Sequence, residues 1–254
     1  MLEQLHTIPI SDAMDNAGEC PFCYIERRTE DRVLDFVLGH GASYMEADIR
    51  EMTDKAGFCR AHFKKMFDYG NSLGNAWILK THYLKTMGEM EKEFKNFHPG
   101  KCKKSLFSKS GEDTKTNSIA DWIRKKENSC FVCDMVDKTF KAYTDTFFQM
   151  YKNDDDFKKK VKETKGFCLS HFAILCEKAD EKLNQKELED FYSAMLPMME
   201  KNMDRMYEDI AWFIEKYDYK NKDADWKDSK DAIQRGMQKL KGQDPSLPPH
   251  KIKK

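Results

Sequence analysis

Residues 20–23 read Cys-Pro-Phe-Cys, and residues 57–63 read Gly-Phe-Cys-Arg-Ala-His-Phe. The same order returns as Cys-Phe-Val-Cys at 130–133 and Gly-Phe-Cys-Leu-Ser-His-Phe at 166–172. The two CxxC motifs start 110 residues apart, and the two GFCxxHF motifs start 109 residues apart. Because chemically reactive residues recur in the same order at matching spacings, we interpret the chain as an internal duplication.

Helical periodicity surrounds the motifs in both copies. Apolar residues return at spacings of three and four after each CxxC motif, in 25–40 and in 134–152. Longer segments with the same pattern, 71–97 and 185–217, close the copies. The chain of 254 residues has only 12 Gly and 7 Pro, which is few for the many tight turns of an all-β fold. We therefore predict an all-α fold of two pseudo-repeated helical units.

A Lys-, Ser- and Gly-rich segment separates the two copies. Such a composition is typical of an exposed linker. We accordingly predict four regions, namely a first helical repeat at 1–97, a basic linker at 98–118, a second repeat at 119–218, and a C-terminal helix with a flexible tail at 219–254.

Each copy carries three thiols and one imidazole at spacings that suit a metal ion. The Cys and His of each GFCxxHF motif are three residues apart, so on a helix they share one face. The CxxC thiols can meet in the same way where a turn opens a helix. We therefore predict that each unit is pinned by one Cys₃His metal site: Cys20, Cys23, Cys59 and His62 in the first, and Cys130, Cys133, Cys168 and His171 in the second.

Three thiolates and one imidazole are a ligand set of closed, structural zinc sites. Iron–sulfur clusters usually take four cysteines, so the histidine favours zinc, two ions per chain, while a mononuclear iron site stays open. The remaining cysteines and histidines have no counterpart in the other copy, and we do not assign them as ligands: Cys102, Cys176, His6, His40, His82, His98 and His250.

The charge balance limits the classes of partner. The chain has 44 Lys and Arg and 44 Asp and Glu, so no global field attracts nucleic acid or an anionic membrane. No stretch approaches the roughly 18 apolar residues of a membrane span, and no secretory signal pattern opens the sequence. We therefore expect a cytoplasmic protein, where thiols stay reduced and clustered cysteines bind metal or act in catalysis rather than form disulfides.

These observations favour a metal-binding scaffold or binding module for an unknown protein or small-molecule partner, with no catalytic residue assigned. Two alternatives stay open. The first is thiol- or metal-dependent redox chemistry, since CPFC before a helix is similar to the glutaredoxin tetrapeptide; against it, no βαβ pattern precedes the motif and the second copy lacks the proline. The second is a nucleic-acid-associated zinc protein, which rests on Lys101, Lys103, Lys104, Lys109 and the basic C-terminal segment.

Several segments together resemble a bacterial family of unknown function. They are CPFC followed by ERRTEDRVLDFVL, then DIREMTDKAGFCRAHF and GNSLGNAWIL, and the resemblance extends over nearly the whole chain. It implies a bacterial, cytoplasmic and anaerobic setting. It brings no known activity and no catalytic residues.

Overall fold

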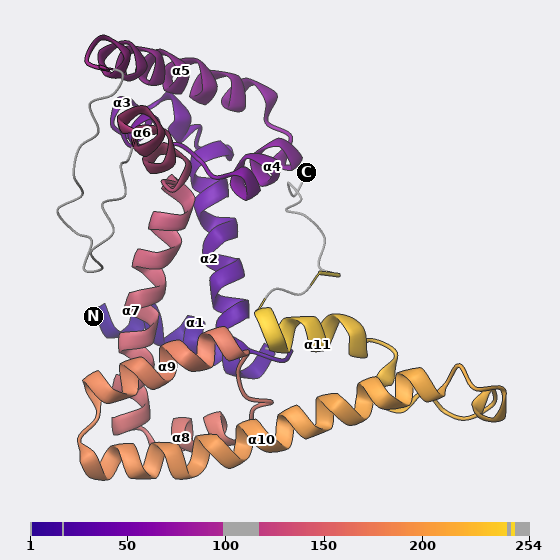
Figure 1. Ribbon diagram of the computed structural model, residues 1–254. Helices are drawn as coiled ribbons and strands as arrows, with labels where there is room; N and C mark the ends of the chain where they lie inside the picture. Colours follow the sequence, from indigo (N-terminus) through magenta and orange to yellow (C-terminus); the bar gives the residue numbers. More distant parts are fainter. Residues whose placement is uncertain (1, 17, 99–116, 243–244, 247–254) are drawn as a thin grey trace. The chain divides into compact units, whose positions relative to one another are not determined.

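The computed structural model describes residues 2–16, 18–98, 117–242 and 245–246 (Figure 1). This part of the chain contains helices and connecting segments and no strand, so the all-α prediction is confirmed. The α-helices are α1 (Leu2–Asn16), α2 (Pro21–Leu38), α3 (Ala47–Ala56), α4 (Arg60–Tyr69), α5 (Ser72–Lys95), α6 (Ser118–Glu127), α7 (Phe131–Asn153), α8 (Asp155–Glu163), α9 (Leu169–Lys182), α10 (Gln185–Glu215) and α11 (Ala232–Lys241). Short 3₁₀ helices span Ser43–Met45, Tyr219–Asn221 and Lys227–Ser229. No helix in the described ranges is both long and apolar enough to cross a membrane.

The chain divides into two compact units that are not contiguous in sequence. Within the described ranges, unit 1 consists of residues 2–29 and 138–246, and unit 2 consists of Glu30–Asp137. Helices α2 and α7 therefore each contribute residues to both units. The repeat boundaries given above describe similarity along the sequence, and they stay a prediction.

Unit 1 has a core rich in aromatic side chains. Phe22, on the first turn of α2, lies with its ring centroid 5.3 Å from Phe140, 5.4 Å from Phe147 and 5.4 Å from Phe167, in edge-to-face contacts. Such pairs stabilise beyond their buried area, by about 0.5–1.5 kcal/mol each. Helices α8, α9 and α11 pack against the long α10 and complete this unit.

Unit 2 is built around the second half of α2 and the start of α7. Its buried side chains include Leu34 on α2 and Ile78 on α5. Phe131, the first residue of α7, contacts Phe58 at a centroid distance of 6.4 Å. Helix α5 packs on α3, α4 and α6 in this unit. Each core thus holds the start of a CxxC helix against the phenylalanine of a GFCxxHF motif.

Candidate metal centres

The eight residues predicted as ligands form two clusters, but their partners are exchanged relative to the sequence prediction. One cluster joins the first CxxC motif to the second CxxH motif, and the other joins the second CxxC motif to the first CxxH motif. Within each cluster one ligand atom from every residue lies within 4.8 Å of the others, so each group could hold a metal ion. The members are Cys20, Cys23, Cys168 and His171 in site 1, and Cys59, His62, Cys130 and Cys133 in site 2.

The prediction that each site lies within one sequence repeat is therefore wrong. Its physical basis was the spacing inside each motif, and that spacing is the same whichever CxxC motif meets whichever CxxH motif. The partners are set by which helix starts pack together: α2 meets α9 in unit 1, and α7 meets α4 in unit 2.

In site 1 the imidazole lies among three thiols. Nδ1 of His171 is 3.5 Å from Cys20 Sγ, 3.4 Å from Cys23 Sγ and 3.2 Å from Cys168 Sγ. The Sγ atoms of Cys23 and Cys168 are 3.7 Å apart. All four residues are buried, with 7% or less of their surface exposed.

Site 2 repeats this geometry. Nδ1 of His62 is 3.2 Å from Cys59 Sγ, 3.2 Å from Cys130 Sγ and 3.4 Å from Cys133 Sγ. The Sγ atoms of Cys59 and Cys133 are 4.0 Å apart. His62 and Cys130 are buried, whereas Cys59 and Cys133 are only half-buried. Site 2 is therefore the more accessible of the two.

Helix starts position the ligands in both sites. Cys59 and Cys168 are the N-cap residues of α4 and α9, so each histidine follows three residues later on the first turn. Cys20 and Cys130 precede α2 and α7 in the same way. Four helix N-termini thus face thiols, and the partial positive charge of a helix N-terminus stabilises a thiolate.

The glycine of each GFCxxHF motif turns the chain into the ligand helix. Gly57 has φ 64° and Gly166 has φ 79°, a left-handed region that other residues avoid. The carbonyl of Gly57 also accepts a hydrogen bond of 2.9 Å from the backbone N–H of Phe131, which ties the start of α7 to the start of α4. The positive φ therefore explains why glycine occupies this position in both motifs.

Each histidine ring has a carboxylate on the side opposite the thiols. Nε2 of His62 is 2.7 Å from Glu30 Oε1, and Lys65 Nζ lies 2.5 Å from both oxygens of that carboxylate. Nε2 of His171 is 3.6 Å from Glu26 Oε2, a longer and more exposed contact. Sequence spacing around the cysteines gave no signal for Glu26 or Glu30. Such carboxylates fix the ring orientation of metal-ligating histidines.

The thiols and imidazoles perturb one another's protonation. Burial disfavours the charged imidazole, but Cys130 and Glu30 raise the pKa of His62 to about 10. Burial opposes the thiolate of Cys130, yet the hydrogen bond from His62 lowers its pKa to about 6. In site 1, burial is likewise outweighed by Cys168 and Cys20, which raise the pKa of His171 to about 10. Each cluster therefore stabilises a thiolate beside an imidazolium, and a cation entering it would displace the proton.

The C-terminal part of unit 1 closes site 1. Gly242 follows α11, and a Cβ placed on it would lie 3.4 Å from Cys168 Sγ and 3.7 Å from Cys23 Sγ. Lys239 of α11 is almost fully buried, and its Nζ donates to the carbonyls of Glu19 and Lys165. The end of α11 thus shields the thiols of site 1 from solvent.

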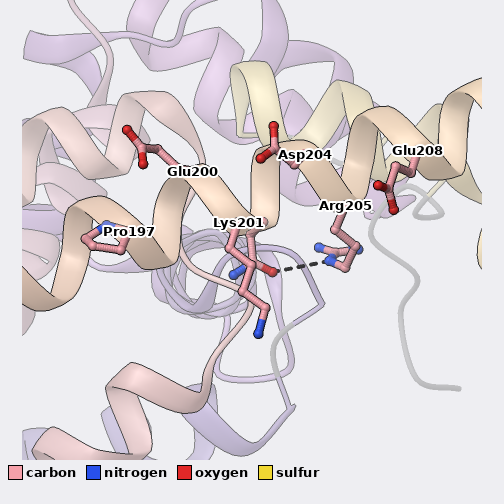
Figure 2. A pocket seen from close by; sticks show the side chains of 7 residues that line it. Pro197, Glu200, Lys201, Asp204, Arg205 and Glu208 are labelled. Atoms are coloured by element: carbon pink, nitrogen blue, oxygen red, sulfur yellow. Dashed lines mark hydrogen bonds between the residues drawn. The ribbon is translucent and has the colours of Figure 1, made fainter.

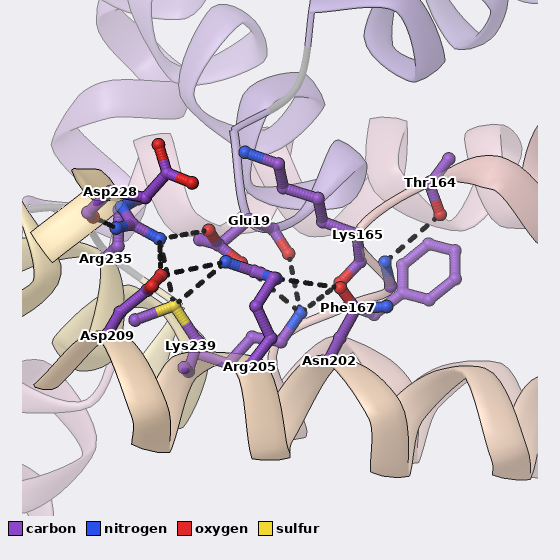
Figure 3. A network of polar contacts seen from close by, with 12 residues as sticks. Glu19, Thr164, Lys165, Phe167, Asn202, Arg205, Asp209, Asp228, Arg235 and Lys239 are labelled. Carbon is purple, nitrogen blue, oxygen red and sulfur yellow. Dashed lines mark hydrogen bonds and ion pairs between the residues drawn. The ribbon is translucent and has the colours of Figure 1, made fainter. Parts of the chain in front are cut away.

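An ion-pair network holds α11 in this place (Figure 3). Glu19 is fully buried directly before Cys20, and its carboxylate accepts from Arg205 at 2.5 Å and from Arg235 at 3.2 Å. Arg235 also donates to Asp209 at 2.9 Å. Burial acts to raise the pKa of Glu19, but the arginines and a nearby lysine lower it overall, so the buried carboxylate is kept ionised.

A family model described as a family of unknown function, DUF6062, matches residues 1–246. The chain belongs to DUF6062. The match contains both CxxC motifs and both CxxH motifs, so the resemblance to a family of unknown function is confirmed. No curated protein and no solved structure matches the chain significantly. DUF6062 membership assigns no activity to the two clusters.

Among the described residues of this DUF6062 chain, the other cysteines and histidines take no part in the two clusters. Cys176 is half-buried on α9, and its backbone carbonyl accepts from Tyr192. His82 Nδ1 is 3.0 Å from the carbonyl oxygen of Asp54, and the ring of His6 contacts Tyr143. His40 and His98 are exposed. Cys102, His250 and the lysines of the basic linker lie outside the described residues.

A shallow hollow lies along α10, apart from the clusters (Figure 2). Residues of one helix line it, from Pro197 to Glu208, and both acidic and basic side chains are present. Arg205 Nε donates to Asn202 there at 3.2 Å. Its mixed charge and single-helix wall indicate no particular ligand.

Proposed function

We propose that each cluster holds one zinc ion, two per chain, and that the ions are structural. The carrying observation is that three thiols and one imidazole converge twice, with their ligand atoms within 4.8 Å of one another. In this proposal the chain is a metal-stabilised helical scaffold or binding module for a protein or small-molecule partner.

The separations between ligand atoms fit one tetrahedral ion. Bonds of about 2.3 Å to sulfur and about 2.0 Å to nitrogen give tetrahedral edges of about 3.8 Å between sulfurs and about 3.5 Å between sulfur and nitrogen. The observed sulfur–sulfur distances are 3.7 and 4.0 Å. The sulfur–nitrogen distances range from 3.2 to 3.5 Å. This spacing supports a single ion rather than a multi-iron cluster.

The donor set favours zinc among single ions. Soft thiolates with one imidazole in a closed four-ligand site are typical of structural zinc, while a catalytic zinc keeps an open position. The carboxylates of Glu26 and Glu30 behind the histidines supply the outer contacts expected of such sites. A mononuclear iron would use the same residues and is distinguished by colour and metal analysis.

Each ion would stabilise the packing of two helix N-termini. Site 1 joins the start of α2 to the start of α9, and site 2 joins the start of α7 to the start of α4. A bound zinc supplies bonds that hold two helix N-termini together. Glu19, Lys239 and Gly242 shield site 1, which suits a structural ion and would hinder access of a substrate.

Burial gives no support to the redox alternative at the CPFC motif. A thiol that exchanges with a substrate disulfide is partly exposed, whereas Cys20 is 1% and Cys23 7% exposed. For nucleic-acid association, the basic linker that suggested it lies outside the described residues. The reducing cytoplasm expected from the sequence suits free thiols that bind metal.

Metal analysis of the full chain tests the proposal. Protein purified under reducing conditions without chelator should be colourless and contain two zinc ions per chain, and removal of the ions should lower the melting temperature. Iron in place of zinc would overturn the identity of the metal. Full thermal stability without metal would overturn the structural role.

A further inference from the structure

Helix α5 has a seam of exposed, mostly apolar side chains on the side that faces away from its own unit. Its buried residues, Gly74 and Ile78, lie on the side that packs within unit 2. Seven exposed positions on the opposite side alternate at spacings of three and four residues, which is the heptad spacing of a coiled coil. They are Leu73, Ala76, Lys80, Tyr83, Met87, Met90 and Phe94.

The exposure of this seam is high for large apolar side chains. Leu73 and Tyr83 are 64% exposed, Met87 57% and Phe94 51%, and the neighbouring Leu84 is 73% exposed. Single exposed apolar residues are common, but a contiguous row of them marks an interaction surface. Over these 22 positions the row runs about 30 Å along the helix, at about 1.5 Å per residue.

We propose that this seam binds the same seam of a second copy of the chain, with the two α5 helices antiparallel. In a two-fold dimer both partners use the same patch. If residue i of one chain contacts residue j of the other, then residue j of the first chain also contacts residue i of the second. A two-fold axis at the level of residue 85 pairs the six seam positions from Ala76 to Phe94 with one another, and Leu73 extends past the end of the partner helix. Tyr83 then lies opposite Met87, and Ala76 opposite Phe94, which pairs a small side chain with a large one.

The charge in the seam selects the antiparallel arrangement. Lys80 occupies a core position of the heptad, and an unpaired buried ammonium is costly. In a parallel pair, Lys80 would face its own copy, and the two charges would repel. In the antiparallel pair, Lys80 lies opposite Met90 and beside Glu91 of the second copy. Glu91 is exposed at the edge of the seam and pairs with Lys95 of its own helix. A partner helix of another protein would need its own carboxylate at that place.

The oligomeric state of the full chain, purified with its metal, tests this directly. Sedimentation equilibrium should show a monomer–dimer equilibrium over about 1–300 µM chain. Met87→Glu places a charge at the centre of the seam and should weaken dimerisation by at least about tenfold. Ile214→Glu, at a 67% exposed position on α10, is the matched control and should leave the equilibrium unchanged. Helix content and metal content should be unchanged in both variants.

A charge exchange tests the direction of pairing. Lys80→Glu and Glu91→Lys should each weaken the dimer, and the double variant should restore it. A wild-type chain that stays monomeric throughout would overturn the proposal. A dimer that survives Met87→Glu, or a double variant that is not rescued, would also overturn it. The proposal is independent of the identity of the metal.

Discussion

Cys23 Sγ lies 3.7 Å from Cys168 Sγ, although 145 residues separate the two cysteines. The GFCxxHF motif nearest to Cys23 along the chain contains Cys59, which belongs to the other cluster. Forming a contact between distant segments has an entropic cost, and this cost rises slowly with the length of the loop between them. Metal binding in these sites would therefore stabilise the packing of segments that are far apart in sequence, rather than either repeat alone.

The exchanged partners predict the metal content of double variants. Cys59→Ser with Cys130→Ser removes two ligands from site 2 and should leave one ion per chain. Cys20→Ser with Cys59→Ser removes one ligand from each site and should leave no tightly bound ion. Metal analysis after gel filtration checks both. If each site lay within one repeat, the first double variant would keep no ion and the second would keep one. The experiment therefore distinguishes pairing within repeats from pairing between them.

The carboxylate behind His62 should affect metal affinity without being a ligand. Glu30→Gln keeps the size of the side chain but removes the charge facing Nε2, and we expect an affinity loss of about 10–100-fold at site 2. Glu26→Gln should have a smaller effect at site 1, because its contact with His171 is 3.6 Å long and half exposed. Competition with a colorimetric chelator measures both. Equal effects of the two variants would contradict the geometry.

Site 2 should release its ion before site 1. Cys59 and Cys133 are half-buried, whereas every ligand of site 1 is buried and the end of α11 lies against it. Chains with a single intact site are the test: Cys130→Ser with Cys133→Ser keeps site 1, and Cys20→Ser with Cys23→Ser keeps site 2. Release to excess chelator should be at least about tenfold faster from site 2. A difference of about 1.4 kcal/mol between the free energies of local opening at the two sites is enough for that ratio. Faster release from site 1 would argue against shielding by α11.

The buried network around Glu19 should be sensitive to loss of one partner. Arg235→Met removes one of the two arginines that pair with the fully buried Glu19, and we expect a loss of about 1.5–3 kcal/mol, because Arg205 still pairs with that carboxylate. Arg124→Met is the control, because the Arg124–Asp121 pair is exposed on α6, and it should have a far smaller effect. Chemical denaturation of the metal-loaded chain measures the difference. If the two variants have the same free energy of unfolding, the buried network does not stabilise the fold more than an exposed ion pair does.

The glycine of the first GFCxxHF motif should resist substitution. Gly57→Ala forces a side chain onto a backbone with φ 64° and ψ −157°, which costs about 1–3 kcal/mol, and its Cβ would lie 2.9 Å from His82 Cε1. Gly88→Ala in α5 is the matched control, since its Cβ meets no atom within 4 Å and alanine favours a helix by about 0.5–1 kcal/mol. Thermal unfolding should therefore shift in opposite directions for the two variants.

Local patterns in the sequence were sufficient for the fold class and for the eight candidate ligands. Helical periodicity depends on neighbours three and four residues away, and so does the meeting of a cysteine with the histidine of the same motif. The carboxylates of Glu26 and Glu30 were not found, because their relation to the histidines crosses from one helix to another. The exposure of the α5 seam could not be predicted either, since periodicity alone does not distinguish a buried face from an unpartnered one.

The sequence by itself determined that this chain is helical, belongs to DUF6062 and carries two CxxC and two CxxH motifs, which offer two sets of three thiols and one imidazole. Only the tertiary structure decided which motifs meet. Phe22, inside the first CxxC motif, packs against Phe167 of the second GFCxxHF motif, and Phe131 packs against Phe58 of the first. These contacts depend on long-range packing of aromatic side chains, which the spacing within a motif does not specify, and they bring each pair of helix starts together.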